Sequence, residues 1–326
     1  MDVQKQIFEI VKEKIHSKKL APVIEEILGI SKDSAYRRIK GEKKLTLLEI
    51  QKICNKFEIS LDDVFNIKKN QCVLFRYIPI DFGNKASYSN YVTQISDILN
   101  TILSFKSGTE FVITAQDIPF YHFFRYPELS LFRLFAWYNI TTDDKKSYCE
   151  FSDSVVKDRI LQIYEQVDKV FMQYPSKEIW TEETIDKTLR LIEYYYESGS
   201  FIFKDSVLLI LEQLSNLLTD IKQFADDGFK DKTKKVPFYL YSCSVDIESN
   251  LLLVKNKNYH SCILKLYSVN IMETENDFLY YEASKWAESL ISKSITISGD
   301  GAFKERYKFF QSANLKVQRL IDKVKG

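Results

Sequence analysis

Basic side chains gather in one short stretch near the start of the chain. Between positions 32 and 44, only Asp33 and Glu42 oppose six positive charges. Ammonium and guanidinium groups neutralise phosphates, and an arginine can also pair with the edge of a guanine. The stretch therefore has the residue types to hold a polyanion such as a nucleic acid, although a basic run is more often an ordinary solvated face. The six positive residues are Lys32, Arg37, Arg38, Lys40, Lys43 and Lys44.

Short helices must position this stretch. An apolar helix pattern from Val23 to Leu28 stops at Gly29, because glycine most easily adopts the left-handed conformation that ends a helix. Ser31 can begin a second helix by accepting backbone N–H groups, and Gly41 ends it. Two short helices joined by a tight turn, the second basic and exposed, fit a helix laid in the major groove of DNA.

The flanking residues extend this pattern to five helices. Thr46 and Glu49 have the spacing of a capping box, in which each side chain bonds to the backbone N–H of the other. A helix over 47–57 follows, and Ser60 begins a last short helix. Apolar residues recurring every four positions predict a first helix over 4–16.

The run from Val23 to Phe65 resembles the helix-turn-helix domain of the lambda-repressor/Cro family of bacterial and phage regulators. The matching features are the two glycines with Ser31 and Ala35, the 47–57 helix, and the ending at 59–65. The resemblance implies a domain that binds double-stranded DNA as a homodimer on a near-palindromic operator.

By position in that motif, the residues fall into two groups. Those expected to reach base edges are Lys32, Asp33, Ser34 and Arg37. Those expected to contact backbone phosphates are Tyr36, Lys40, Lys43 and Lys44. The family usually has an aliphatic residue followed by glutamate where this chain has Arg38 and Ile39. The inner stripe of the helix is expected to run from Ala35 to Ile39, so Arg38 is the alternative base-reading arginine.

Charge divides the chain into two parts. The first 70 residues hold 15 Lys and Arg against 11 Asp and Glu, whereas the whole chain holds 46 against 45. With 326 residues there is room for two or three domains. We predict a helix-turn-helix domain over residues 1–66, a polar linker over 67–70, and a larger domain over 71–326.

The larger domain is expected to be α+β with helical hairpins and an antiparallel sheet, in a chain that is mainly helical. Strand patterns at 73–78 and 111–115 flank a helix at 88–105, which suggests a right-handed βαβ unit. Three helices within 156–221 carry apolar residues at alternating spacings of four and three, which fit an internal core or a dimer interface. Three antiparallel strands are predicted at 238–247, 251–254 and 262–271.

An aromatic-rich segment over 117–138 holds the candidates for a ligand pocket. Such pockets are apolar with a few convergent polar groups, here Asp117, His122 and Arg125. Large aromatic residues are also ordinary material for a core or a dimer interface. Any ligand would be an unidentified small-molecule effector.

The sequence lacks a recognisable catalytic or metal-binding pattern. His16, His122 and His260 do not have the spacing of a zinc site. Gly299, Asp300 and Gly301 could form a phosphate-binding turn, but Asp300 as a helix N-cap explains them more simply. We therefore expect no catalytic residue, no metal and no cofactor.

The cellular compartment follows from cysteines and hydropathy. Five widely spread cysteines form no disulfide framework, which predicts reduced thiols. No apolar run approaches the roughly 20 residues of a membrane span, and the first residues do not read as a signal peptide. We expect a cytoplasmic protein without a membrane partner.

The expected function is a sequence-specific transcriptional regulator that acts as a homodimer, with a C-terminal domain for dimerisation and effector sensing. The alternative is a protein-interaction module that has a helix-turn-helix fold and does not bind DNA. The basic recognition helix argues against that alternative. An enzyme with a regulatory N-terminal domain is a third and weaker interpretation.

Overall fold

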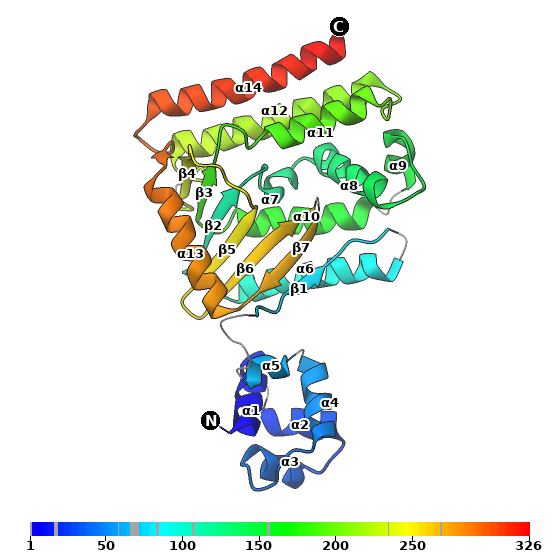
Figure 1. Ribbon diagram of the computed structural model, residues 1–326, viewed down its shortest axis with the longest axis vertical. Coiled ribbons are helices and arrows are strands. Elements are labelled where there is room, and N and C mark those ends of the chain that lie inside the picture. The colour runs from blue at the N-terminus through cyan, green and yellow to red at the C-terminus, as the bar shows by residue number, and fades with distance from the viewer. Residues whose placement is uncertain are drawn as a thin grey trace. The chain divides into compact units, whose positions relative to one another are not determined.

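The chain folds into two compact units, Met1–Val73 and Leu74–Gly326 (Figure 1). The structure is a computed structural model that describes residues 2–15, 19–57, 59–65, 72–82, 85–105, 108–154, 157–233, 235–267 and 269–326. The predicted linker at 67–70 lies outside these residues. The fold is a mainly helical α+β arrangement, which confirms the fold class predicted from the sequence.

Five helices make up the described part of the N-terminal unit. They are α1 (Val3–Lys14), α2 (Leu20–Leu28), α3 (Lys32–Ile39), α4 (Leu47–Phe57) and α5 (Leu61–Val64). Their apolar faces meet in one small core, and α3 and α5 lie at opposite ends of this bundle (Figure 1). The core residues are Ile7, Phe8, Val11, Ile24, Leu28, Ala35, Ile53 and Val64.

Local capping fixes the ends of α2, α3 and α4. Gly29 ends α2 with φ of 64°, in the left-handed region that glycine adopts at little cost. The Ser31 hydroxyl accepts a hydrogen bond from the backbone N–H of Ser34 at 3.4 Å. Thr46 and Glu49 form the predicted capping box, with bonds of 3.0 and 3.3 Å. Each cap contributes about 1 kcal/mol to the stability of its helix.

The C-terminal unit is built on one mixed sheet. Its strands are β1 (Arg76–Ile78), β2 (Glu110–Ala115), β3 (Ser176–Trp180), β4 (Phe238–Ser242), β5 (Leu251–Asn256), β6 (Tyr259–Leu266), β7 (Asn270–Thr274) and β8 (Ile295–Thr296). They lie in the order β1-β7-β6-β5-β2-β3-β4-β8. Strands β2, β3 and β4 are parallel, and the other neighbouring pairs are antiparallel.

The predicted βαβ unit is wrong in its pairing. Strand β1 pairs with β7 at one edge, so three strands separate it from β2. The parallel neighbour of β2 is β3, which the sequence analysis missed. Strand β3 carries Lys177 and Glu178 in the sequence Ser-Lys-Glu-Ile-Trp, so its hydropathy does not mark it as a buried strand.

The predicted three-stranded antiparallel group is partly confirmed. Strands β5 and β6 form the expected hairpin. Strand β4 does not pair with β5, because β2 and β3 lie between them. The predicted third strand is divided in two, since β6 ends at Leu266 and β7 begins at Asn270.

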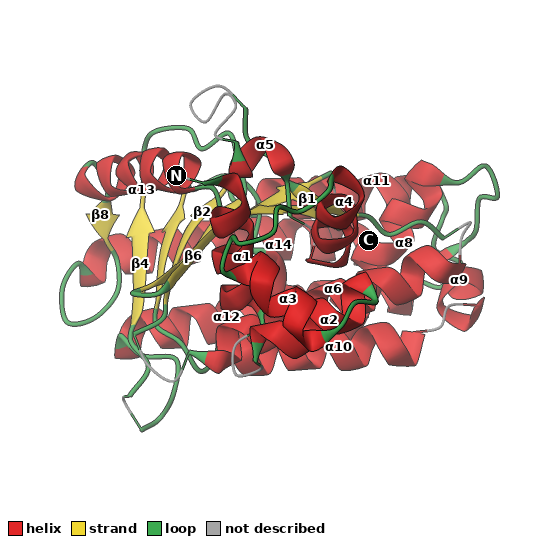
Figure 2. Cartoon of the chain, turned by 90° about the horizontal axis from the view of Figure 1, so that it is seen from below, coloured by secondary structure: helices red, strands yellow, loops and turns green. Residues whose placement is uncertain are grey.

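Helices cover both faces of the sheet (Figure 2). The helices are α6 (Lys85–Ser104), α7 (Phe120–Phe123), α8 (Pro127–Thr141), α9 (Tyr148–Ser154), α10 (Lys157–Phe171), α11 (Asp186–Glu197), α12 (Lys204–Asp227), α13 (Asp277–Ser292) and α14 (Phe303–Lys325). One face packs against α13 through a small cluster that includes Ile179 and Leu253. The other face meets the main core, which includes residues of α6, α8, α10 and α12.

The apolar stripes with spacings of four and three belong to this main core. Ile163, Val170, Ile192, Leu214 and Ile221 are all buried in it. The interpretation as an internal core, rather than a dimer interface, accounts for these helices. Any dimer interface must therefore use other side chains.

Candidate nucleic-acid interface

The outer face of α3 carries most of the side chains that the sequence singled out. Lys32, Asp33, Tyr36, Arg37 and Lys40 are exposed, and Ser34 is half-buried. Lys43 and Lys44 are exposed in the turn that follows. Gly41 supports this turn with φ of 82°, and the backbone N–H of Lys43 returns to the carbonyl of Arg37 at 3.1 Å. Helix and turn thus expose five basic side chains, with the acidic Asp33 and Glu42 among them.

Arg38 does not belong to that surface. Only 4% of it is exposed, and its Nε and Nη2 atoms donate to the two carboxylate oxygens of Glu49 at 3.1 and 2.7 Å. Its Nη1 atom donates to the carbonyl of Ser34 at 3.1 Å. The hydrogen bonds from Arg38 hold the pKa of the Glu49 carboxyl below its ordinary value. The expectation that Arg38 contacts DNA is therefore replaced by a structural role, which fastens α3 to α4.

Two of the exposed cations have acidic neighbours. The Arg37 guanidinium lies 3.9 Å from Glu42, and the Lys44 ammonium lies 2.6 Å from Asp2. The hydrogen bond from Lys44 lowers the pKa of the Asp2 carboxyl. Exposed pairs of this kind contribute about 0–1 kcal/mol and are screened by salt, so a phosphate can displace either carboxylate.

Gln4 is a positioning residue that the sequence analysis missed. Its buried amide donates to the carbonyls of Arg38 at 2.6 Å and Lys43 at 2.9 Å. Its side-chain oxygen accepts from the backbone N–H of Leu45 at 2.9 Å. One glutamine on α1 therefore fixes both ends of the turn after α3. The available signal was that Gln4 occupies the apolar stripe of α1, one turn before Ile7 and Phe8.

The three candidates for a ligand pocket do not come together. Asp117 accepts from Arg133 at 2.7 Å, while Nε2 of His122 lies 2.9 Å from Glu178. Burial alone would raise the pKa of the Asp117 carboxyl, but Arg133 and other donors outweigh burial and lower it.

Arg125 belongs to a third cluster, where it contacts Asp220 at 3.0 Å and Asp168 at 3.3 Å. Each of the three predicted residues thus has its own partners. They do not form a common site.

The Gly299–Gly301 turn presents carbonyl groups rather than N–H groups to its neighbour. Nη1 of Arg306 donates to the carbonyls of Gly299 at 2.9 Å and Gly301 at 3.1 Å. This arrangement is the opposite of a phosphate-binding turn, which offers N–H donors. The predicted N-cap role of Asp300 is also wrong, because Ala302 caps α14 without a side-chain bond.

The described part of the chain was also compared with the requirements of a metal site and of a membrane span. Within it, no three His, Cys, Asp or Glu residues are grouped so that they could hold a metal ion. The same residues contain no helix with the length and hydropathy of a membrane span.

Comparison with known proteins gives one match. Neither a curated protein nor a solved structure matches the chain. A family model, that of the BetR domain, matches residues 4–75, which are the residues that form the five-helix unit and its exposed basic helix. The N-terminal region is thus similar to the BetR domain, a DNA-binding domain of the helix-turn-helix type, and the rest of the chain is not assigned to a family.

Proposed function

We propose that the protein is a sequence-specific transcriptional regulator that binds DNA as a homodimer through lambda-repressor-like helix-turn-helix domains. The observation that carries the proposal is the rigid presentation of α3. Its inner arginine is locked to Glu49, and the turn after it is held by Gln4. Its outer face carries exposed basic residues. A bacterial regulator of transcription acts where the DNA is, so we place the protein in the cytoplasm. We assign it no catalytic role.

In this proposal α3 lies in the major groove, with its first turns at the base edges. The residues assigned to bases are Lys32, Asp33, Ser34 and Arg37. The residues assigned to phosphates are Tyr36, Lys40, Lys43 and Lys44. A single small domain makes too few contacts with DNA for tight specific binding. Two copies on half-sites about 34 Å apart double the number of contacts.

Arg37→Ala is expected to relax sequence preference. A bidentate pair between an arginine and a guanine contributes about 1–3 kcal/mol of discrimination, which corresponds to roughly 5- to 150-fold in affinity ratio. Competition binding with the selected operator and a scrambled duplex at one salt concentration measures that ratio. Lys12→Ala on α1 is the matched control and should leave it unchanged. An unchanged ratio in Arg37→Ala would remove Arg37 from the base-reading set.

The Lys43→Ala, Lys44→Ala double variant is expected to weaken binding to all duplexes alike. Each lost phosphate contact should reduce the slope of log K against log salt concentration by about one. Lys52→Ala with Lys56→Ala removes the same charge from exposed positions of α4 and serves as the control. Equal slopes in the two double variants would place the turn after α3 away from DNA.

We assign dimerisation to the outer face of α14. Phe303 is 72% exposed there, and Tyr307 and Leu315 are also exposed. Gln311 and Gln318 continue the same face, and the exposed charged residues Lys304 and Asp322 interrupt it. Dimer interfaces are enriched in aromatic residues and depleted in charged ones. A second copy of the chain is the partner that such a face fits.

One observation favours a protein-interaction module as a second candidate. Leu47 and Leu48 at the start of α4 are 79% and 70% exposed, which is unusual for adjacent leucines outside an interface. Titration with random duplex DNA at rising salt separates the two candidates. Binding that weakens steeply with salt supports the regulator, whereas no binding at low salt supports a protein partner at these leucines.

A further inference from the structure

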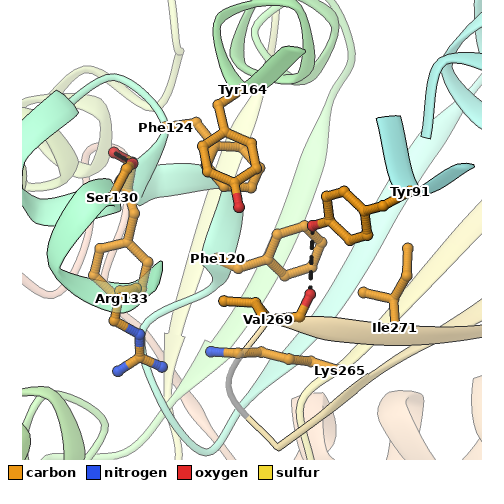
Figure 3. A pocket seen from close by; sticks show the side chains of 10 residues that line it. Tyr91, Phe120, Phe124, Ser130, Arg133, Tyr164, Lys265, Val269 and Ile271 are labelled. Atoms are coloured by element: carbon orange, nitrogen blue, oxygen red, sulfur yellow. Dashed lines mark hydrogen bonds between the residues drawn. The ribbon is translucent and has the colours of Figure 1, made fainter. Parts of the chain in front are cut away.

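A small cavity of about 20 Å³ lies inside the C-terminal unit (Figure 3). Its wall is aromatic, with Phe124 and Tyr164 stacked 3.9 Å apart at their ring centres. Tyr91 contributes a further ring, and its hydroxyl reaches the carbonyl of Val269 at 3.4 Å. The residues that line the cavity come mainly from α6, α7, α8, α10, β6 and β7.

Two cations lie together at one end of this cavity. The Lys265 side chain on β6 and the Arg133 guanidinium on α8 both line it, and Figure 3 shows their charged groups on the same side. The side chains of Lys265 and Arg133 are only 3% and 9% exposed. Two buried positive charges therefore face the same small space.

One carboxylate is shared between these cations. Asp117 accepts from Arg133 at 2.7 Å and from the Thr188 hydroxyl at 2.8 Å. The Lys265 ammonium reaches the same carboxylate only at 3.5 Å, which is long for a charge-assisted hydrogen bond. The cluster therefore holds one positive charge in excess, and a buried charge without compensation is costly.

The surroundings of Lys265 confirm that its charge is poorly compensated. Burial and the neighbouring Arg133 lower the pKa of the Lys265 ammonium to about 7, although Asp117 opposes them. Lys187 on α11 adds a further positive charge nearby.

We propose that this cavity binds one small monovalent anion, either chloride or a short carboxylate such as formate, beside Lys265 and Arg133. The anion supplies the missing negative charge. Arg133 has five N–H donors, and a single carboxylate oxygen does not exhaust them. A cavity must offer roughly 10–15 Å³ to hold a water molecule, so the available 20 Å³ suits a monatomic ion such as chloride more closely than a larger guest.

The place of the cavity in the fold agrees with this assignment. Asp117 follows the carboxyl end of β2, which has the parallel strand β3 on one side and the antiparallel strand β5 on the other. Open sheets with parallel strands bind ligands at the carboxyl ends of their strands. The site lies wholly within residues 74–326, so it stands whether or not the N-terminal unit binds DNA.

Chloride NMR on the full chain tests the proposal directly. The ³⁵Cl line should broaden with wild-type protein and not with Lys265→Met. Lys230→Met is the matched control, since Lys230 is also buried but donates to the carbonyls of Phe171 and Tyr174, away from the cavity. Circular dichroism verifies that each variant is folded. Equal broadening by wild type and folded Lys265→Met would overturn the proposal.

Thermal unfolding of wild-type protein provides a test that needs no variant. At equal ionic strength, chloride or formate should raise Tm above its value in gluconate, which is too large for the cavity. Because binding requires protonated Lys265, the affinity should fall by about tenfold per pH unit above pH 7. Formate that narrows the chloride line shares the site and favours a carboxylate ligand, and formate without effect leaves chloride as the ligand. Equal Tm values in all three salts at pH 6, with no chloride broadening, would overturn the proposal and leave the DNA-binding proposal untouched.

Discussion

Arg38→Ala is expected to unfold the N-terminal unit and to leave the C-terminal unit folded. The substitution removes three hydrogen bonds and leaves the half-buried Glu49 carboxylate without its cation. Breaking one side of a buried ion pair costs about 3–5 kcal/mol. A single core of this size rarely supplies more than about 3–5 kcal/mol of stability. The loss is therefore comparable to the whole stability of the unit.

Calorimetry of the full chain measures this effect, because two compact units can give separate transitions. Arg37→Ala is the matched control: it removes the neighbouring exposed arginine and should shift the free energy of unfolding by less than about 0.5 kcal/mol. Arg38→Lys keeps the charge but loses the bidentate geometry. Its loss in the free energy of unfolding should therefore lie between those of Arg38→Ala and Arg37→Ala. A first transition that is unchanged in Arg38→Ala would show that the ion pair with Glu49 contributes no net stability.

The fragment 71–326 is expected to be a dimer on its own. The N-terminal unit uses most of its apolar side chains for its own core and exposes few large ones, among them Leu47 and Leu48, whereas a stable interface needs about 1,200 Å² or more of buried surface. Sedimentation of the fragment at tens of micromolar measures its state. A monomer there would move the interface to the N-terminal unit.

A double variant tests the assignment to α14. Tyr307→Glu with Leu315→Glu places two negative charges on the outer face of that helix and should yield monomers of the full chain. Tyr281→Glu introduces the same change at an exposed tyrosine of α13 and should leave the dimer intact. Dissociation by Tyr281→Glu alone would transfer the interface to α13. The DNA affinity of the monomeric variant should fall because each chain then contacts a half-site alone.

The parts of the fold that could be predicted are those set by local sequence. Gly29, Ser31 and the Thr46–Glu49 box act within a few residues of themselves, so they gave the positions of α3 and α4. The burial of Arg38 was not predictable in this way, because its side chain points inward from the middle of a basic run. The composition of the run suggested that Arg38 is solvated, and only tertiary packing shows that its side chain is buried.

The C-terminal unit shows the same limit over longer distances. Strand β3 contains a buried glutamate, Glu178, which is satisfied by His122 at a separation of 56 residues. Asp117, His122 and Arg125 are close in sequence, but each is held by partners on other helices and strands. Proximity along the chain therefore did not predict a shared pocket. The pairing of β1 with β7 spans almost 200 residues and has no local signal.

The two fastenings of α3, one from α1 through Gln4 and one from α4 through Glu49, have a consequence for how the domain meets its target. These contacts on both sides oppose tilting and unwinding of α3. In the proposed complex the double helix would then adjust to the protein, so base steps that bend and twist easily would be favoured even where no side chain touches them. Complex formation would carry the heat-capacity change of the contact area alone, without the larger change that accompanies the ordering of a segment on binding.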